Sequence, residues 1–130
     1  MKGLGNLARI LVIDDEVGIR QIIKLALFQY DVDILEAETG QTGLDIAIAE
    51  QPDALILDYR LPDIAGDRVA EQYRAEGGLA PIILLSASAE IDRLARHPAI
   101  TAALPKPFRL TQLWQILESL ITLPSARPET

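Results

Sequence analysis

Four consecutive apolar residues lead directly into a carboxylate in the stretch Ala54-Leu55-Ile56-Leu57-Asp58. Two further apolar runs of the same length occupy residues 10–13 and 82–85. Continuous apolar runs of this length are typical of parallel strands that are covered on both faces of a sheet. The three runs therefore predict the buried centre of a parallel sheet.

Strand-like and helix-like stretches alternate along the chain. Strands are predicted at residues 9–13, 32–37, 54–57, 82–85 and 101–104, and the second, which is more polar, is expected at the sheet edge. Helices are predicted around residues 19–26, 44–48, 65–74, 90–96 and 110–121. Because crossovers between parallel strands are right-handed, the predicted class is α/β, a (βα)5 flavodoxin-like, doubly wound parallel sheet of five strands in the order 2-1-3-4-5.

The spacing of apolar residues also predicts which helix faces meet the sheet. The first helix should use Ile19, Ile22, Ile23 and Ala26, and the second Leu44, Ala47 and Ile48. The last helix should use Leu110, Leu113, Leu117 and Leu120. Trp114 lies on the flank of that last stripe, where helix packing is favoured over a role as a partner anchor.

Length and composition bound the class of protein. The chain has 130 residues, of which 49% are hydrophobic, so one globular domain is expected, over residues 9–123. Residues 1–8 are then an N-terminal tail, and residues 124–130 a C-terminal tail or the start of a linker. The net charge of −7 argues against nucleic acid as a direct partner.

Targeting signals and cysteines narrow the class further. The absence of cysteine excludes disulfides and thiolate metal sites. No apolar run is long enough to span a bilayer, and the first residues lack the apolar stretch of a signal peptide. We therefore expect a cytoplasmic protein with no membrane association.

Polar residues with complementary chemistry follow four of the predicted strands. They are Asp14-Asp15, Asp58, Ser86 and Lys106. Taken singly, each has an ordinary explanation as a helix cap, a polar strand end or a surface charge. In an open parallel sheet, however, the carboxyl ends of the strands share one edge, where ligands bind. Their occurrence together, in this order, favours one shared site.

The chemistry of these groups is consistent with a Mg²⁺-dependent phosphoryl site. Mg²⁺ prefers hard oxygen ligands, which Asp58 and the acidic pair can supply. Asp58 can also act as a nucleophile and form an acyl phosphate. The ammonium of Lys106 and the hydroxyl of Ser86 suit phosphoryl oxygens. X-Pro bonds adopt the cis form far more readily than others, and a cis Lys106–Pro107 bond would aim the lysine inward.

These motifs together resemble the response-regulator receiver domain of two-component signalling, the CheY-like superfamily. The resemblance is carried by residues 10–16, 55–62, 83–87 and 106–108, and it covers residues 9–123. It implies a phosphoprotein whose phosphoryl donor is a sensor histidine kinase or a histidine phosphotransfer protein. It also implies a signalling phosphoacceptor that catalyses its own phosphorylation and slow dephosphorylation.

The resemblance also implies a role for each residue of the site. Asp58 would be the phosphoacceptor. The ligands of Mg²⁺ would be Asp14, Asp15, Asp58 and the backbone carbonyl of Arg60. The phosphoryl group would contact Ser86, Lys106 and the amide of Ala87. The donor would dock beside the acidic pair, with Val17 and Gly18 as candidate contacts.

One position departs from the usual pattern of the family. Three residues before Lys106, where receivers that signal by the usual switch carry an aromatic ring, the chain has Ala103. In the family, the serine or threonine at the position of Ser86 moves toward the phosphoryl group, and the aromatic ring turns inward behind it as the switch. The fourth helix, fifth strand and fifth helix often form the face that dimerises or binds an effector. Because Ala103 replaces the ring, the sequence does not predict whether this chain signals through that face.

Three other readings remain. A pseudo-receiver that only binds proteins would keep the fold without a phosphorylation-driven switch, and Ala103 is its best support. A Mg²⁺-dependent phosphatase with an aspartyl nucleophile would carry an acid two residues after Asp58, where this chain has Arg60. A flavodoxin is disfavoured, because the pair Asp14-Asp15 would repel a phosphate unless a metal intervened.

Overall fold

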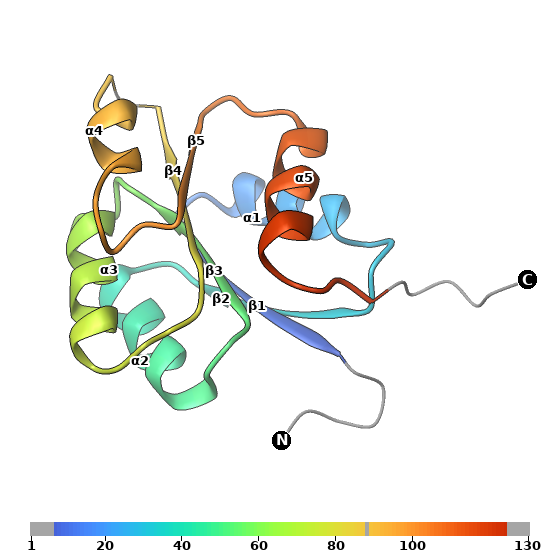
Figure 1. The fold of residues 1–130 in the computed structure, drawn as a ribbon, viewed down its shortest axis with the longest axis horizontal. Helices are drawn as coiled ribbons and strands as arrows, with labels where there is room; N and C mark the ends of the chain where they lie inside the picture. Colours follow the sequence, from blue (N-terminus) through green and yellow to red (C-terminus); the bar gives the residue numbers. More distant parts are fainter. Residues whose placement is uncertain (1–6, 88, 125–130) are drawn as a thin grey trace, which may run out of the picture.

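The computed structural model describes residues 7–87 and 89–124 (Figure 1). The strands are β1 (Ala8–Ile13), β2 (Val32–Ala37), β3 (Ala54–Asp58), β4 (Ile82–Ser86) and β5 (Ala102–Pro105). The helices are α1 (Val17–Ala26), α2 (Gly40–Glu50), α3 (Gly66–Ala75), α4 (Ile91–Ala95) and α5 (Leu110–Leu120). Most of the two expected tails falls outside the described residues.

All strand pairs are parallel, and the sheet order is β2-β1-β3-β4-β5. The predicted fold class and strand order are therefore confirmed, as is the edge position of the more polar β2. Each predicted strand lies within one residue of the observed one at either end. Of the helices that the structure describes, none combines the length and apolarity that a bilayer crossing needs.

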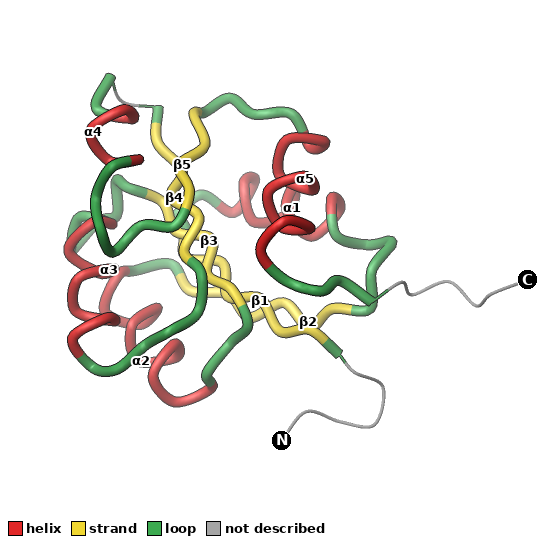
Figure 2. The backbone as a smooth tube through the Cα atoms, viewed as in Figure 1, coloured by secondary structure: helices red, strands yellow, loops and turns green. Residues whose placement is uncertain are grey.

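The helices form one layer on each face of the sheet (Figures 1 and 2). Alternate residues of β1 point to opposite faces, so Leu11 and Ile13 pack with α2, α3 and α4. Ile10 and Val12 pack with α1 and α5 on the other face. Because both faces are covered, β3 and β4 are buried along their whole length.

The apolar faces of two helices differ from the prediction by one residue each. Ile23 and Ala26 of α1 are buried as expected, but Ile22 is 42% exposed. Ile48 of α2 is also 42% exposed. On α1 the buried side is instead extended by Leu27, just past the helix end, because residues 20, 23 and 27 share one helical face.

The last helix packs as predicted. Leu113 and Leu117 are fully buried, and Leu110 and Leu120 lie partly buried against the same core. Trp114 also packs there, and its indole N–H donates to the backbone carbonyl of Ala26 in α1. The favoured explanation of Trp114 as a packing residue is confirmed.

The register of the strands brings their carboxyl ends together at one edge. Ile13 pairs with Leu57, Asp58 with Leu85, and Ser86 with Pro105. The residue that follows each of these strands therefore enters the same region of space. At this edge α3 begins at Gly66, whose amide donates to the carbonyl of Tyr59 at 2.7 Å.

Candidate functional site

A lysine and two buried carboxylates meet at the carboxyl edge of the sheet. The Lys106 ammonium lies 3.2 Å from Asp14 Oδ2 and 3.2 Å from Asp58 Oδ1. Asp14 follows β1, Asp58 ends β3, and Lys106 follows β5. Lys106 is thus in direct contact with both aspartates, one of which lies 92 positions before it in the sequence.

Burial and the neighbouring charges shift the pKa values of all three groups. The residues Asp14 and Asp58 are 0% and 4% exposed. Burial raises the pKa of Asp58 above its ordinary range, and the negative charge of Asp14 adds to this, against the pull of Lys106. Burial likewise raises the pKa of Asp14. For Lys106 burial lowers the pKa, but the two carboxylates outweigh it, so the pKa of the ammonium is raised.

A cluster of four carboxylates surrounds this contact. Asp14, Asp15, Glu16 and Asp58 each offer an oxygen atom, and these atoms lie within 4.8 Å of one another. Lys106 brings one positive charge to these four carboxylates, so negative charge is in excess within the cluster. Hard oxygen donors with excess negative charge fit a divalent cation such as Mg²⁺.

Glu16 was not predicted as part of the site. Its carboxylate lies 3.5 Å from the Lys106 ammonium, so the lysine faces a third acid. Its backbone N–H donates to Asp14 Oδ1 at 2.9 Å and fixes the direction of that carboxylate. The only signal in the sequence was its place directly after the acidic pair.

The remaining predicted residues lie around Asp58. Ser86 is buried at the end of β4, and its carbonyl accepts a hydrogen bond from the Lys106 amide at 3.0 Å. Ala87 follows it at the surface. A hydrogen bond from the backbone of Arg60 acts to lower the pKa of Asp58. The Lys106–Pro107 peptide bond is cis.

Ala103 lies outside this contact network. It is half-buried in β5, opposite Leu84 of β4, whose side chain packs on the face covered by α4. Residues paired in register share a face, so the position lies on the side of the sheet that α4 covers.

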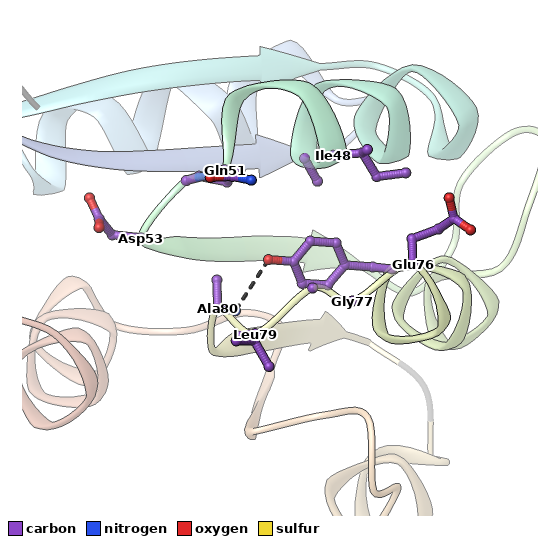
Figure 3. A pocket seen from close by; sticks show the side chains of 11 residues that line it. Ile48, Gln51, Asp53, Glu76, Gly77, Leu79 and Ala80 are labelled. Carbon is purple, nitrogen blue, oxygen red and sulfur yellow. Dashed lines mark hydrogen bonds between the residues drawn. The ribbon is translucent and has the colours of Figure 1, made fainter. Parts of the chain in front are cut away.

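A hollow of about 490 Å³ lies away from this site, at the end of the sheet where β3 and β4 begin (Figure 3). It is lined by the last turns of α2 and α3 and by the residues that lead into β3 and β4. The Tyr73 hydroxyl there accepts a hydrogen bond from the Ala80 amide at 3.2 Å. Its lining residues include carboxylates and apolar groups but no lysine or arginine, so it does not match a phosphoryl site.

Comparison with known proteins places the chain in a family. The profile described as "Response regulator receiver domain" matches residues 10–118. The chain belongs to this receiver family. The receiver domain is one part of two-component signalling systems, in which such domains receive phosphoryl groups from histidine kinases.

Two curated relatives carry the name response regulator MprA. The protein of Mycolicibacterium vanbaalenii is 33% identical over 115 residues, and that of Mycobacterium tuberculosis is 34% identical over 115 residues. In both comparisons the match covers 87% of this receiver chain and 50% of the relative. The chain thus spans about half the length of the curated relatives it matches.

Solved structures agree with the receiver assignment. The Thermotoga maritima response regulator TrrA, solved in complex with Mg²⁺-BeF, is 32% identical, with a TM-score of 0.81, covering 88% of this chain and 100% of that one. Vibrio cholerae CheY4 shares the fold, with 24% identity and a TM-score of 0.80, covering 89% of this chain and 100% of that one.

Proposed function

We propose that this receiver domain accepts a phosphoryl group from a phosphohistidine donor onto Asp58, in a Mg²⁺-dependent reaction. The observation that carries the proposal is the contact of Lys106 with Asp58 and Asp14 at the carboxyl edge of the sheet. In this contact a carboxylate that can act as a nucleophile, an acid that can bind a cation and an ammonium that can bind phosphate oxygens lie together.

The metal would be held by Asp14, Asp15, Asp58 and the backbone carbonyl of Arg60. When bound, it would neutralise the clustered carboxylates and the charge of the incoming phosphoryl group. The gathering of four carboxylates around a single lysine supports this assignment. Glu16 is close enough to contribute an oxygen, directly or through water.

In the transfer step, a carboxylate oxygen of Asp58 attacks phosphorus and forms the O–P bond of an acyl phosphate. The N–P bond of the donor breaks, and the histidine nitrogen keeps the electron pair. Lys106 exchanges its contacts with Asp58 for the phosphoryl oxygens. The hydroxyl of Ser86 and the amide of Ala87 donate hydrogen bonds to the same group.

The donor would dock on α1, beside the acidic pair. Val17, at the start of the helix, is 57% exposed. A methyl group built onto Gly18 would meet nothing within 4 Å, so the surface there is open. Leu25 of α1 and Phe28, two residues past the helix end, are further exposed apolar residues. An α-helical partner, a sensor histidine kinase or a histidine phosphotransfer protein, suits exposed apolar residues on a helix.

Ala103 supports a second candidate, a pseudo-receiver that binds proteins without a phosphorylation-driven switch. The alanine removes the ring that usually relays phosphorylation to the face of α4, β5 and α5. A homodimer or an effector bound to this face would then be recognised independently of phosphorylation. The intact Lys106 contacts favour the phosphorylated receiver over this candidate.

Intact mass spectrometry separates the two candidates. Wild type and Asp58→Asn would be incubated with acetyl phosphate, phosphoramidate or a phosphorylated histidine phosphotransfer protein, with and without Mg²⁺. We expect one phosphoryl adduct on wild type that requires Mg²⁺ and is absent from Asp58→Asn. No adduct from any of the three donors would contradict the proposal and favour the pseudo-receiver.

A further inference from the structure

The guanidinium of Arg20 is buried between the backbone of Asp14 and the edge strand β2. The residue is 7% exposed, although it lies on α1, whose other charged residue, Lys24, is exposed. Its Nε donates to Glu36 Oε1 of β2 at 2.9 Å, and a second nitrogen lies 3.6 Å from Glu38. Removing a guanidinium from water costs folding free energy, so a buried arginine at this position is expected to have a specific role.

The same guanidinium also holds the backbone of the site. Its Nη1 donates to the carbonyl oxygen of Asp14 at 2.6 Å. The amide of Asp14 donates to the carbonyl of Ala37 in β2 at 3.0 Å. The backbone of Asp14 is therefore fixed on both sides, once by the strand next to it and once by Arg20.

The bond to the Asp14 carbonyl determines where Asp15 lies. The peptide unit is planar, so fixing the carbonyl oxygen of Asp14 fixes the amide and the Cα of Asp15. Asp15 is itself exposed, and its side chain belongs to the carboxylate cluster. Without the hydrogen bond from Arg20, the peptide between the two acids could rotate, and the two carboxylates would no longer be held together.

We infer that Arg20 is a positioning residue, which orients the Asp14–Asp15 peptide and thereby sets the affinity of the site for Mg²⁺. The inference rests on the proposed function, because it assumes that these carboxylates bind the cation. Arg20 touches neither the phosphoryl group nor the reacting atoms. It acts through the carbonyl of Asp14, with Glu36 holding the guanidinium in place.

Electrostatics and positioning predict opposite results when Arg20 is neutralised. A positive charge beside the site repels Mg²⁺, so removing the charge alone should tighten Mg²⁺ binding. Loss of the hydrogen bond to Asp14 should weaken binding, since loss of an outer partner of a metal ligand typically lowers affinity about 10–100-fold. The sign of the change therefore identifies the role of Arg20.

Lys24 offers a matched control. Its ammonium lies 2.8 Å from the second oxygen of Glu36, so it shares that carboxylate with Arg20, whereas the hydrogen bond to the Asp14 carbonyl comes from Arg20. Lys24→Gln removes one positive charge from the same cluster and leaves the Asp14 carbonyl bound. Arg20→Lys keeps the charge but has one ammonium in place of the planar fork that joins Asp14 and Glu36.

The experiment is a Mg²⁺ titration of the phosphate-free protein by calorimetry, on wild type, Arg20→Gln, Arg20→Lys and Lys24→Gln. We expect the dissociation constant to rise about 10-fold in Arg20→Gln, by less in Arg20→Lys, and to stay within about 2-fold of wild type in Lys24→Gln. Acetyl phosphate labelling of Arg20→Gln should recover at saturating Mg²⁺, because only cation binding is impaired.

Each outcome decides one question. Unchanged or tighter binding in a folded Arg20→Gln would overturn the inference. If Arg20→Gln does not unfold cooperatively on heating, it is not properly folded, and Arg20→Lys is used instead. A wild-type affinity of Arg20→Lys for Mg²⁺ would then overturn the inference. Failure of wild type itself to bind Mg²⁺ would instead contradict the proposed function, so the two failures are distinguishable.

Discussion

Replacement of Asp58, the proposed phosphoacceptor, by its neutral isostere asparagine should stabilise the fold. Asp58→Asn keeps the size of the side chain and an oxygen that can accept the Arg60 hydrogen bond. It removes a charge that is 4% exposed and lies within 4.8 Å of a second carboxylate oxygen. We expect this variant to resist unfolding better than wild type at neutral pH without divalent cations.

The magnitude follows from the distances in the site. At an effective dielectric constant of about 20, the Lys106 contact at 3.2 Å favours charged Asp58 by about 5 kcal/mol. Repulsion from Asp14 within 4.8 Å opposes this by about 3 kcal/mol or more. Desolvation of a buried carboxylate costs several kcal/mol and tips the balance. With desolvation taken as about 3–4 kcal/mol, the sum leaves an expected gain in the free energy of unfolding of about 1–2 kcal/mol for Asp58→Asn. The raised pKa of Asp58 has the same sign.

The gain should depend on pH. The folded carboxyl of Asp58 binds its proton more tightly than the unfolded one, whose ordinary pKa is 3.8. Lowering the pH through the raised pKa protonates the folded wild type and removes its penalty. The advantage of Asp58→Asn is therefore largest above the folded pKa and vanishes below 3.8.

Mg²⁺ should reverse the order of stability. Mg²⁺ at about 100 times the dissociation constant adds about 2.7 kcal/mol to wild type, which exceeds the expected advantage of Asp58→Asn, and the variant lacks one ligand. The assay is urea unfolding of both proteins, at neutral and acidic pH, with chelator or with Mg²⁺. A less stable Asp58→Asn in chelator at neutral pH would refute the reasoning, because the carboxylate would then be a net favourable charge.

Three further predictions test the surroundings of the site. A methyl group on Gly66 would lie 2.4 Å from the Asp58 carbonyl oxygen, so Gly66→Ala should lower the free energy of unfolding in urea by about 2 kcal/mol and slow phosphorylation by acetyl phosphate. The control Gly18→Ala, where the methyl group meets open space, should leave the free energy of unfolding unchanged. Lys106→Met should lower the free energy of unfolding by about 2 kcal/mol in chelator and recover part of this loss in Mg²⁺. Its phosphorylation rate should fall at least about 100-fold, and an undiminished phosphoryl adduct in mass spectrometry would contradict the role of Lys106. Ala103→Tyr should keep the wild-type labelling rate, and a strong loss would mean that the position belongs to the phosphoryl site.

The sequence alone predicted the fold and most of the site, because both depend on local patterns. Continuous apolar runs at β1, β3 and β4 identify parallel buried strands whatever their neighbours are. The residues that follow such strands must gather at one edge, so Asp14, Asp58 and Lys106 could be grouped before any coordinates.

Only the tertiary structure decided which charges are buried and what they contact. Periodicity shows that α1 has an apolar face, but it does not show that β2 covers the neighbouring side, so Arg20 had no predicted role and Ile22 was wrongly placed in the core. The partner of Arg20 is Glu36, which is 16 positions away on an edge strand. Glu16 likewise joined the cluster because the fold brings its carboxylate close to Lys106 and to the other three acids. Contacts between side chains of different elements depend on how those elements pack, and a pattern within one element carries no record of them.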